Sequence, residues 1–145
     1  MNELNEIFNM CDVMFSNADI DYNELRSIDI SAKFFEDYNN TRIVNSFLFN
    51  FSKLQDKIGA KLFKKALYEL KEIDGFSIAM IDVLTRLEKL EIVEDGNAWD
   101  NLREIRNILA HEYPLDIDER VENIELALGG YRELKKIYLR LKARF

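Results

Sequence analysis

Apolar residues recur at intervals of three and four along nearly the whole of this chain, and this periodicity is what most constrains its fold. Leu4, Phe8, Cys11 and Phe15 follow it near the N-terminus, and the clearest run covers residues 43–58. This spacing places side chains on one face of an α-helix. No segment alternates strictly between apolar and polar residues, as a half-buried strand does. We therefore predict an all-α chain.

Turn-forming and capping residues divide the pattern into successive helices. The residues expected to cap helices are Asp21, Ser77, Asn97, and Asp116 or Asp118. Gly59 is expected to kink or end the helix that contains it, and Gly129-Gly130 to bend the last helix. Pro114, the only proline, disfavours helical backbone at Tyr113, so the preceding helix is expected to stop near Glu112.

The connections between these helices are short, which favours antiparallel neighbours. We predict an up-and-down antiparallel helical bundle with four main helices plus accessory helices. The chain has 145 residues, the commonest size of a single domain, and no segment has the composition of a linker. We expect one domain over residues 1–145.

The charge balance limits the partners that this chain can bind. It has 20 basic and 27 acidic residues, a net charge of −7. Affinity for a polyanion comes from Lys and Arg, so we expect no DNA partner and only local contact with RNA. Basic residues gather in two stretches, 53–71 and 132–144. We interpret both first as solvated helix faces.

Residue counts exclude several kinds of site. The single Cys, Cys11, cannot form a disulfide within the chain, and with His111 as the only histidine a zinc site within one subunit is not expected. No glycine-rich phosphate-binding motif is present, so we expect neither metal nor cofactor. The apolar runs are far shorter than the ~18 residues of a membrane helix, and no leader is recognisable. We expect a cytoplasmic protein without membrane contact.

Polar side chains gather on the helix that precedes Pro114. At about 100° per residue, Arg103, Arg106, Asn107 and His111 form one band. Asn107 lies four residues before His111, so its amide can orient the imidazole ring. His111 is also the leading candidate for acid–base chemistry near neutral pH.

The stretch Arg106-Asn107-Ile-Leu-Ala-His111-Glu-Tyr113 resembles the Arg-x4-His-x-Tyr motif of the HEPN superfamily, in the form found in HepT-like toxins. The resemblance implies a metal-independent endoribonuclease that is active as a homodimer. It assigns catalysis to Arg106 and His111, with Asn107 and Arg103 in supporting roles. It also implies a minimal nucleotidyltransferase antitoxin, which silences the toxin by transferring AMP from ATP to Tyr113.

The chemistry of these residues is compatible with RNA cleavage. Attack by a 2′-hydroxyl needs a base, an acid for the leaving oxygen, and positive charge near the phosphate. One His111 cannot be base and acid at once, but a symmetric dimer supplies two copies. Arg106 suits the phosphate because its planar fork donates two hydrogen bonds. AMP on Tyr113 would block such a site by its bulk and charge.

Other interpretations of the same residues stay open. The chain is alternatively a non-catalytic HEPN partner that presents substrate or nucleotide to the nucleotidyltransferase. It is alternatively a structural dimerisation bundle, in which the polar band makes an interfacial ion network. The plain interpretation of the single residues is that His111 only caps the end of a helix and Arg106 forms an ion pair with a nearby carboxylate such as Glu104 or Asp100. Tyr113 then packs over the end of the bundle. We assign Trp99 to the core under every interpretation.

Overall fold

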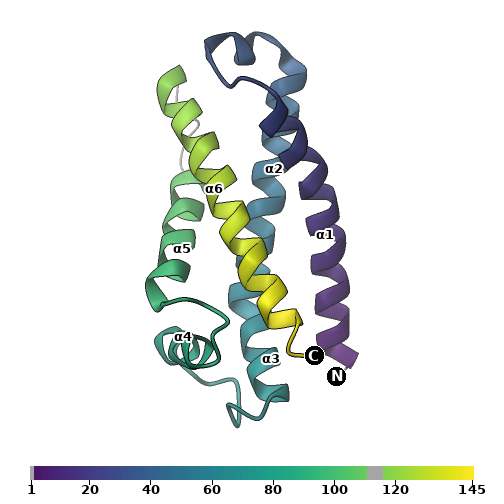
Figure 1. Cartoon of the computed structure of the whole chain (residues 1–145), viewed down its shortest axis with the longest axis vertical. Helices are drawn as coiled ribbons and strands as arrows, with labels where there is room; N and C mark the ends of the chain where they lie inside the picture. Colours follow the sequence, from purple (N-terminus) through teal and green to yellow (C-terminus); the bar gives the residue numbers. More distant parts are fainter. Residues whose placement is uncertain (1, 111–115) are drawn as a thin grey trace.

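The computed structural model describes residues 2–110 and 116–145, which form a helical bundle (Figure 1). Its elements are α1 (Asn2–Ser27), the 3-10 helix η1 (Ala32–Glu36), α2 (Tyr38–Lys57), the π-helix η2 (Ile58–Leu62), α3 (Phe63–Glu69), α4 (Met80–Lys89), α5 (Gly96–Ala110) and α6 (Ile117–Lys142). Strands are absent from the described ranges. The predicted all-α class is confirmed.

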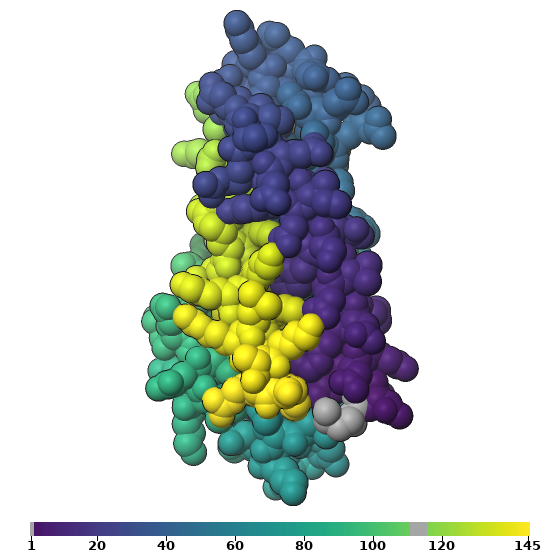
Figure 2. All heavy atoms as spheres, turned by 45° about the vertical axis from the view of Figure 1, so that its right-hand side comes forward, coloured from purple at the N-terminus to yellow at the C-terminus, as the bar shows by residue number. Residues whose placement is uncertain are grey.

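The four long helices run up and down, as predicted. Figure 1 shows α1 rising from the N-terminus, α2 and α3 descending, α5 rising and α6 descending to the C-terminus beside the start of α1. The short α4 crosses the lower end of the bundle as an accessory helix. In Figure 2 the last turns of α6 lie directly against α1.

Aromatic side chains fill much of the core between these helices. The largest fully buried ones are Phe47, Phe51, Phe63, Trp99, Tyr131 and Tyr138. Burying one such side chain stabilises a fold by about 1.5–3 kcal/mol. The assignment of Trp99 to the core is confirmed, since its exposed fraction is 0%.

Two matching groups of polar residues join α1 to α6, and we call them the tyrosine clamps. The lower clamp is Tyr138–Asp12–Lys142 and the upper is Tyr131–Asp19–Lys135. In each, the tyrosine hydroxyl lies 2.6 Å from one carboxylate oxygen and the lysine Nζ lies 2.6 Å from the other. The clamps are seven residues apart on both helices, which is two helical turns, so they fix the register of α1 against α6.

The passage from α2 to α3 is a π-helix, with Gly59 within it. A Cβ atom on Gly59 would lie 2.8 Å from Cζ2 of Trp99, so only glycine lets the indole pack this closely. Trp99 also meets Phe63 edge-on, with ring centroids 4.6 Å apart. The predicted irregularity at Gly59 is confirmed, since a π-helix interrupts the α-helical backbone there.

Three expected helix starts are wrong. Helix α1 continues through Asp21 to Ser27, because Tyr22 and Leu25 prolong its core-facing side. Helix α4 begins at Met80 with no side-chain cap, so Ser77 is not its cap. Helix α5 begins at Gly96. Its capping residue is Asp95, not Asn97, because the Asp95 Oδ1 accepts a hydrogen bond from the N–H of Ala98 at 3.0 Å.

The start of α6 agrees with the prediction. Asp116 accepts a hydrogen bond from the N–H of Asp118 at 3.0 Å, as an N-cap does. The helix then runs unbroken through Gly129 and Gly130. A Cβ on Gly130 would lie 3.2 Å from both Ile105 Cδ1 and Phe51 Cζ, so this glycine permits the close contact of α5 with α6.

Candidate functional site

Arg106 on α5 forms a two-point ion pair with Asp56 on α2. Its Nε lies 3.1 Å from Oδ1 and its Nη2 lies 3.1 Å from Oδ2. The hydrogen bond to Asp56 raises the pKa of Arg106 above its ordinary value. The Arg106 side chain is 30% exposed, so solvent still reaches the guanidinium. The structure thus holds a fixed, accessible cation at the seam between α2 and α5.

The packing of Trp99 accounts for this placement. Arg106 follows Trp99 by seven residues, or two turns, and therefore lies on the same side of α5. Asp56 precedes Gly59 by three residues and lies on the same side of α2. Trp99 packs on Gly59, and further along the contact between α5 and α2 Arg106 lies opposite Asp56.

The paired geometry leaves part of the guanidinium free. An arginine guanidinium carries five N–H donors. Asp56 takes one from Nε and one from Nη2, which leaves three for another acceptor. A phosphate oxygen fits this need, because arginine binds phosphate through several N–H groups in one plane.

The predicted supporting residues lie next to Arg106 on α5. Arg103 is exposed and its Nη1 is 3.7 Å from Asp100 Oδ1, a loose pair along the helix. Asn107 and Ala110 are exposed too. The structure therefore brings Arg103, Arg106 and Asn107 onto one accessible stretch of α5.

His111 and Tyr113 lie outside the described residues, and so does Pro114. Helix α5 is described as far as Ala110, the residue before His111. The roles assigned to His111 and Tyr113, the contact between Asn107 and His111, and the stop near Glu112 stay predictions.

The expectation that Arg106 forms an ion pair with a carboxylate agrees with the structure, but the carboxylate is not one of the two given as examples. Neither Glu104 nor Asp100 pairs with it; its partner is Asp56, 50 residues away. Sequence reasoning missed Asp56, although one feature marks it. It is the only acidic residue of α2.

An exposed aromatic side chain lies on the same side of α2 as Asp56. Phe49 is 62% exposed, with the Lys53 ammonium 5.7 Å from its ring centroid. Phe49 precedes Asp56 by seven residues, so both lie on one side of α2. The site is a charged group bordered by apolar surface.

Several other kinds of site find no support in the described ranges. No three His, Cys, Asp or Glu side chains there are grouped so that they could share a metal ion. Burial raises the pKa of Cys11 to about 11, so its thiol is not a nucleophile at neutral pH. No helix in residues 2–110 and 116–145 has the length and apolar character needed to span a bilayer.

Comparisons with protein-family models, with curated proteins and with solved structures found no match to this chain.

Proposed function

We propose that this chain is a HEPN-type, metal-independent endoribonuclease toxin of the HepT kind, acting in the cytoplasm. The observation that carries the proposal is Arg106, the first residue of the Arg-x4-His-x-Tyr motif, which Asp56 holds in place while three of its N–H groups have no partner among residues 2–110 and 116–145. Arg106 and His111 are the catalytic residues, with Asn107 and Arg103 in support.

Arg106 supplies the positive charge that the reaction needs. During attack by the 2′-hydroxyl, negative charge grows on the phosphate oxygens. A donor that is already fixed in position stabilises this charge without reorganisation, and loss of one such donor typically lowers the rate about 10²–10³-fold. Asp56 is then a positioning residue, because it holds the guanidinium without touching the RNA.

The proposal requires a homodimer, since His111 from one chain acts as base while its mate acts as acid. Phe49 is 62% exposed on the side of α2 that bears Asp56, which favours a covered surface there. Ala110 is small and exposed on the same helix, which lets a second α5 approach closely.

The proposed regulator is a nucleotidyltransferase antitoxin that transfers AMP to Tyr113. Tyr113 follows His111 by two residues, so an AMP group there lies close to the catalytic histidine. The added phosphate is an anion of the kind that Arg106 binds, and it competes with RNA for the site.

A second candidate is a non-catalytic HEPN partner that presents substrate or nucleotide to the nucleotidyltransferase. Two observations favour it: the net charge is −7, and Asp56 already neutralises Arg106. Both weaken the attraction of the site for RNA.

One set of variants separates the two functions. Wild-type protein, Arg106→Ala, His111→Ala and the matched control Arg86→Ala, an exposed arginine on α4, are tested for RNA cleavage with and without EDTA. We expect a loss of at least about 100-fold for Arg106→Ala and His111→Ala, less than twofold for Arg86→Ala, and no effect of EDTA. Equal behaviour of all four proteins contradicts the nuclease.

The regulator is tested by intact mass. After incubation with the proposed nucleotidyltransferase partner, ATP and magnesium, the mass should rise by one or more AMP units, but not for Tyr113→Phe. An unchanged wild-type mass argues against Tyr113 as the target. Modification by AMP without any RNA cleavage supports the second candidate.

A further inference from the structure

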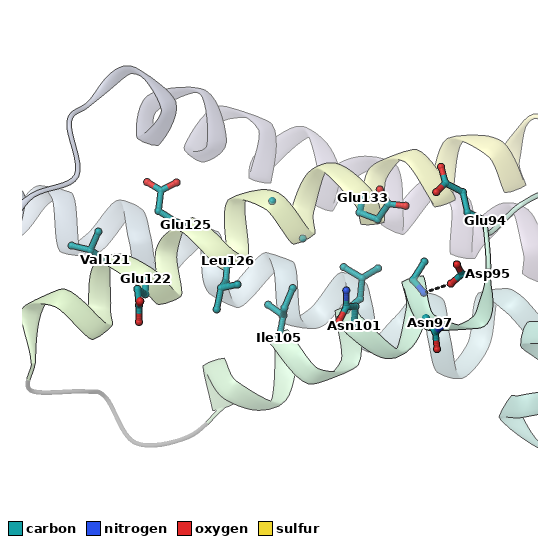
Figure 3. Close-up of a pocket in the computed structure, with 14 residues that line it drawn as sticks. Glu94, Asp95, Asn97, Asn101, Ile105, Val121, Glu122, Glu125, Leu126 and Glu133 are labelled. Carbon is teal, nitrogen blue, oxygen red and sulfur yellow. Dashed lines mark hydrogen bonds between the residues drawn. The ribbon is translucent and has the colours of Figure 1, made fainter.

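An apolar groove of about 920 Å³ lies between α5 and α6, on the side of α5 that faces away from Asp56. Leu102 and Ile105 line it from α5, and Val121 and Leu126 from α6. Figure 3 shows Ile105 and Leu126 pointing toward each other from the two helices. Leu126 is 44% exposed, so the groove presents apolar surface to solvent.

Carboxylates surround this apolar floor. They are Glu94 and Asp95 before α5, and Glu122, Glu125 and Glu133 on α6. Glu94 lies 3.7 Å from Arg140 and Asp95 caps α5, but the three glutamates of α6 form no ion pair with any residue of the described ranges. No lysine or arginine of these ranges lines the groove. The groove is therefore negative, with five carboxylates against Arg140 beside Glu94 and Arg132 beside Gly129.

Gly129 opens the floor of the groove at its middle. A Cβ there would have one neighbour within 4 Å, Nη2 of Arg132 at 3.8 Å, so packing within the chain does not require glycine. Glycine inside a helix costs about 1 kcal/mol relative to alanine. The missing side chain leaves backbone accessible in the groove, where an occupant can approach closely.

We propose that this groove binds a basic amphipathic α-helix of a partner protein. From Val121 to Glu133 the groove follows thirteen residues of α6, a rise of about 18 Å, which matches about three turns of a bound helix. The bound helix places apolar residues at positions i, i+3 or i+4, and i+7 on the floor. Its Lys and Arg side chains reach the glutamates of α6, whereas RNA is repelled by them. The site is separate from Arg106 and does not rest on the proposed function.

The probe is a fluorescein-labelled 16-residue peptide with leucines at helical spacing and lysines on both flanks. Its binding is measured by anisotropy, beside a counterpart in which glutamate replaces every lysine. We expect saturable binding of the lysine peptide, weaker at high salt, and none of the glutamate peptide. Equal binding of the two peptides, or no saturable binding of the lysine peptide, overturns the proposal.

Charge-removing variants locate the site. The groove variant combines Glu122→Gln, Glu125→Gln and Glu133→Gln, and the matched control combines Glu6→Gln, Glu24→Gln and Glu36→Gln, which are exposed elsewhere. Both change the net charge by the same amount. We expect the groove variant to bind the lysine peptide at least 10-fold more weakly and the control to lose less than twofold. Equal losses indicate non-specific attraction and overturn the proposal.

Filling the groove gives an independent test. Gly129→Phe should abolish binding, whereas Gly129→Ala, which adds only a methyl group, should retain it. Thermal unfolding checks that both variants are folded. If Gly129→Phe does not fold, the test rests on the glutamine variants described above. Unchanged binding by folded Gly129→Phe overturns the proposal. Light scattering gives a further check. If the wild type is a dimer and Gly129→Phe is a monomer, a second copy of this chain occupies the groove, and the proposal is overturned.

Discussion

The tyrosine clamps predict how strongly the hydroxyl of Tyr138 stabilises the fold. Tyr138→Phe removes the hydroxyl's hydrogen bond to the Asp12 carboxylate and its 3.0 Å contact with the carbonyl oxygen of Phe8, and it adds no volume, so the packing of the ring is kept. A hydrogen bond to a charged group contributes about 1.5–3 kcal/mol. Asp12 is 42% exposed and keeps Lys142, so its carboxylate stays partly compensated. We therefore expect a loss near the lower end, about 1–2 kcal/mol.

Urea denaturation followed by circular dichroism measures this loss. With an m value of about 2 kcal/mol/M, the midpoint should fall by about 0.5–1 M. Tyr131→Phe should cost a similar amount, because its hydroxyl makes the same contact with Asp19. The clamps are two turns apart, about 10 Å, so the double variant should cost the sum, about 2–4 kcal/mol.

Tyr38→Phe is the matched control, since this tyrosine is 73% exposed and should change stability by less than about 0.5 kcal/mol. The reasoning is refuted if Tyr138→Phe is as stable as this control. It is also refuted if the double variant departs from the sum by more than about 0.5 kcal/mol, because the clamps are then not independent.

Three further predictions follow from local geometry. Gly59→Ala should lower the free energy of unfolding by about 1–3 kcal/mol in urea denaturation, because its Cβ would meet the rigid indole of Trp99 at 2.8 Å; an unchanged midpoint contradicts this. Lys71→Gly should raise the melting temperature, with a gain of about 0.5–1 kcal/mol, since Lys71 has a φ of 61° at the end of α3; a lower melting temperature contradicts it. Burial raises the pKa of Asp12, but the hydrogen bonds from Lys142 and Tyr138 outweigh it and keep the pKa below its ordinary value. The stability from this clamp is present above pH 4 and lost as the pH falls below about 4, so the urea midpoint should depend less on acid in Asp12→Asn than in wild type; equal dependence contradicts it.

Helix boundaries show where local sequence competes with packing. Asp21-x-x-Glu24 has the spacing of a helix start, yet α1 continues through it because Leu25 is buried at 1% exposure. At Asp116 no such competition exists, and the expected cap forms. A capping residue contributes about 1 kcal/mol, less than the burial of one leucine, so packing decides where the two conflict.

The basic stretches show the same limit. In residues 132–144 the solvated face is present, with Arg132, Lys136 and Arg144 exposed, but Lys135 and Lys142 also bind Asp19 and Asp12 in the tyrosine clamps. Periodicity alone identifies which side of a helix is polar. It does not identify which helix lies beside that polar side.

The sequence by itself determined the helical class, the up-and-down order, the buried face of each main helix and the polar band that contains Arg106, because these depend on residue spacing within one helix. Only the tertiary structure decided that Asp56 is the partner of Arg106 and that carboxylates line a groove between α5 and α6. Both features join residues that are far apart in the chain. They depend on the position of α5 relative to α2 and α6. Close packing at Gly59, Trp99 and Gly130 determines this position.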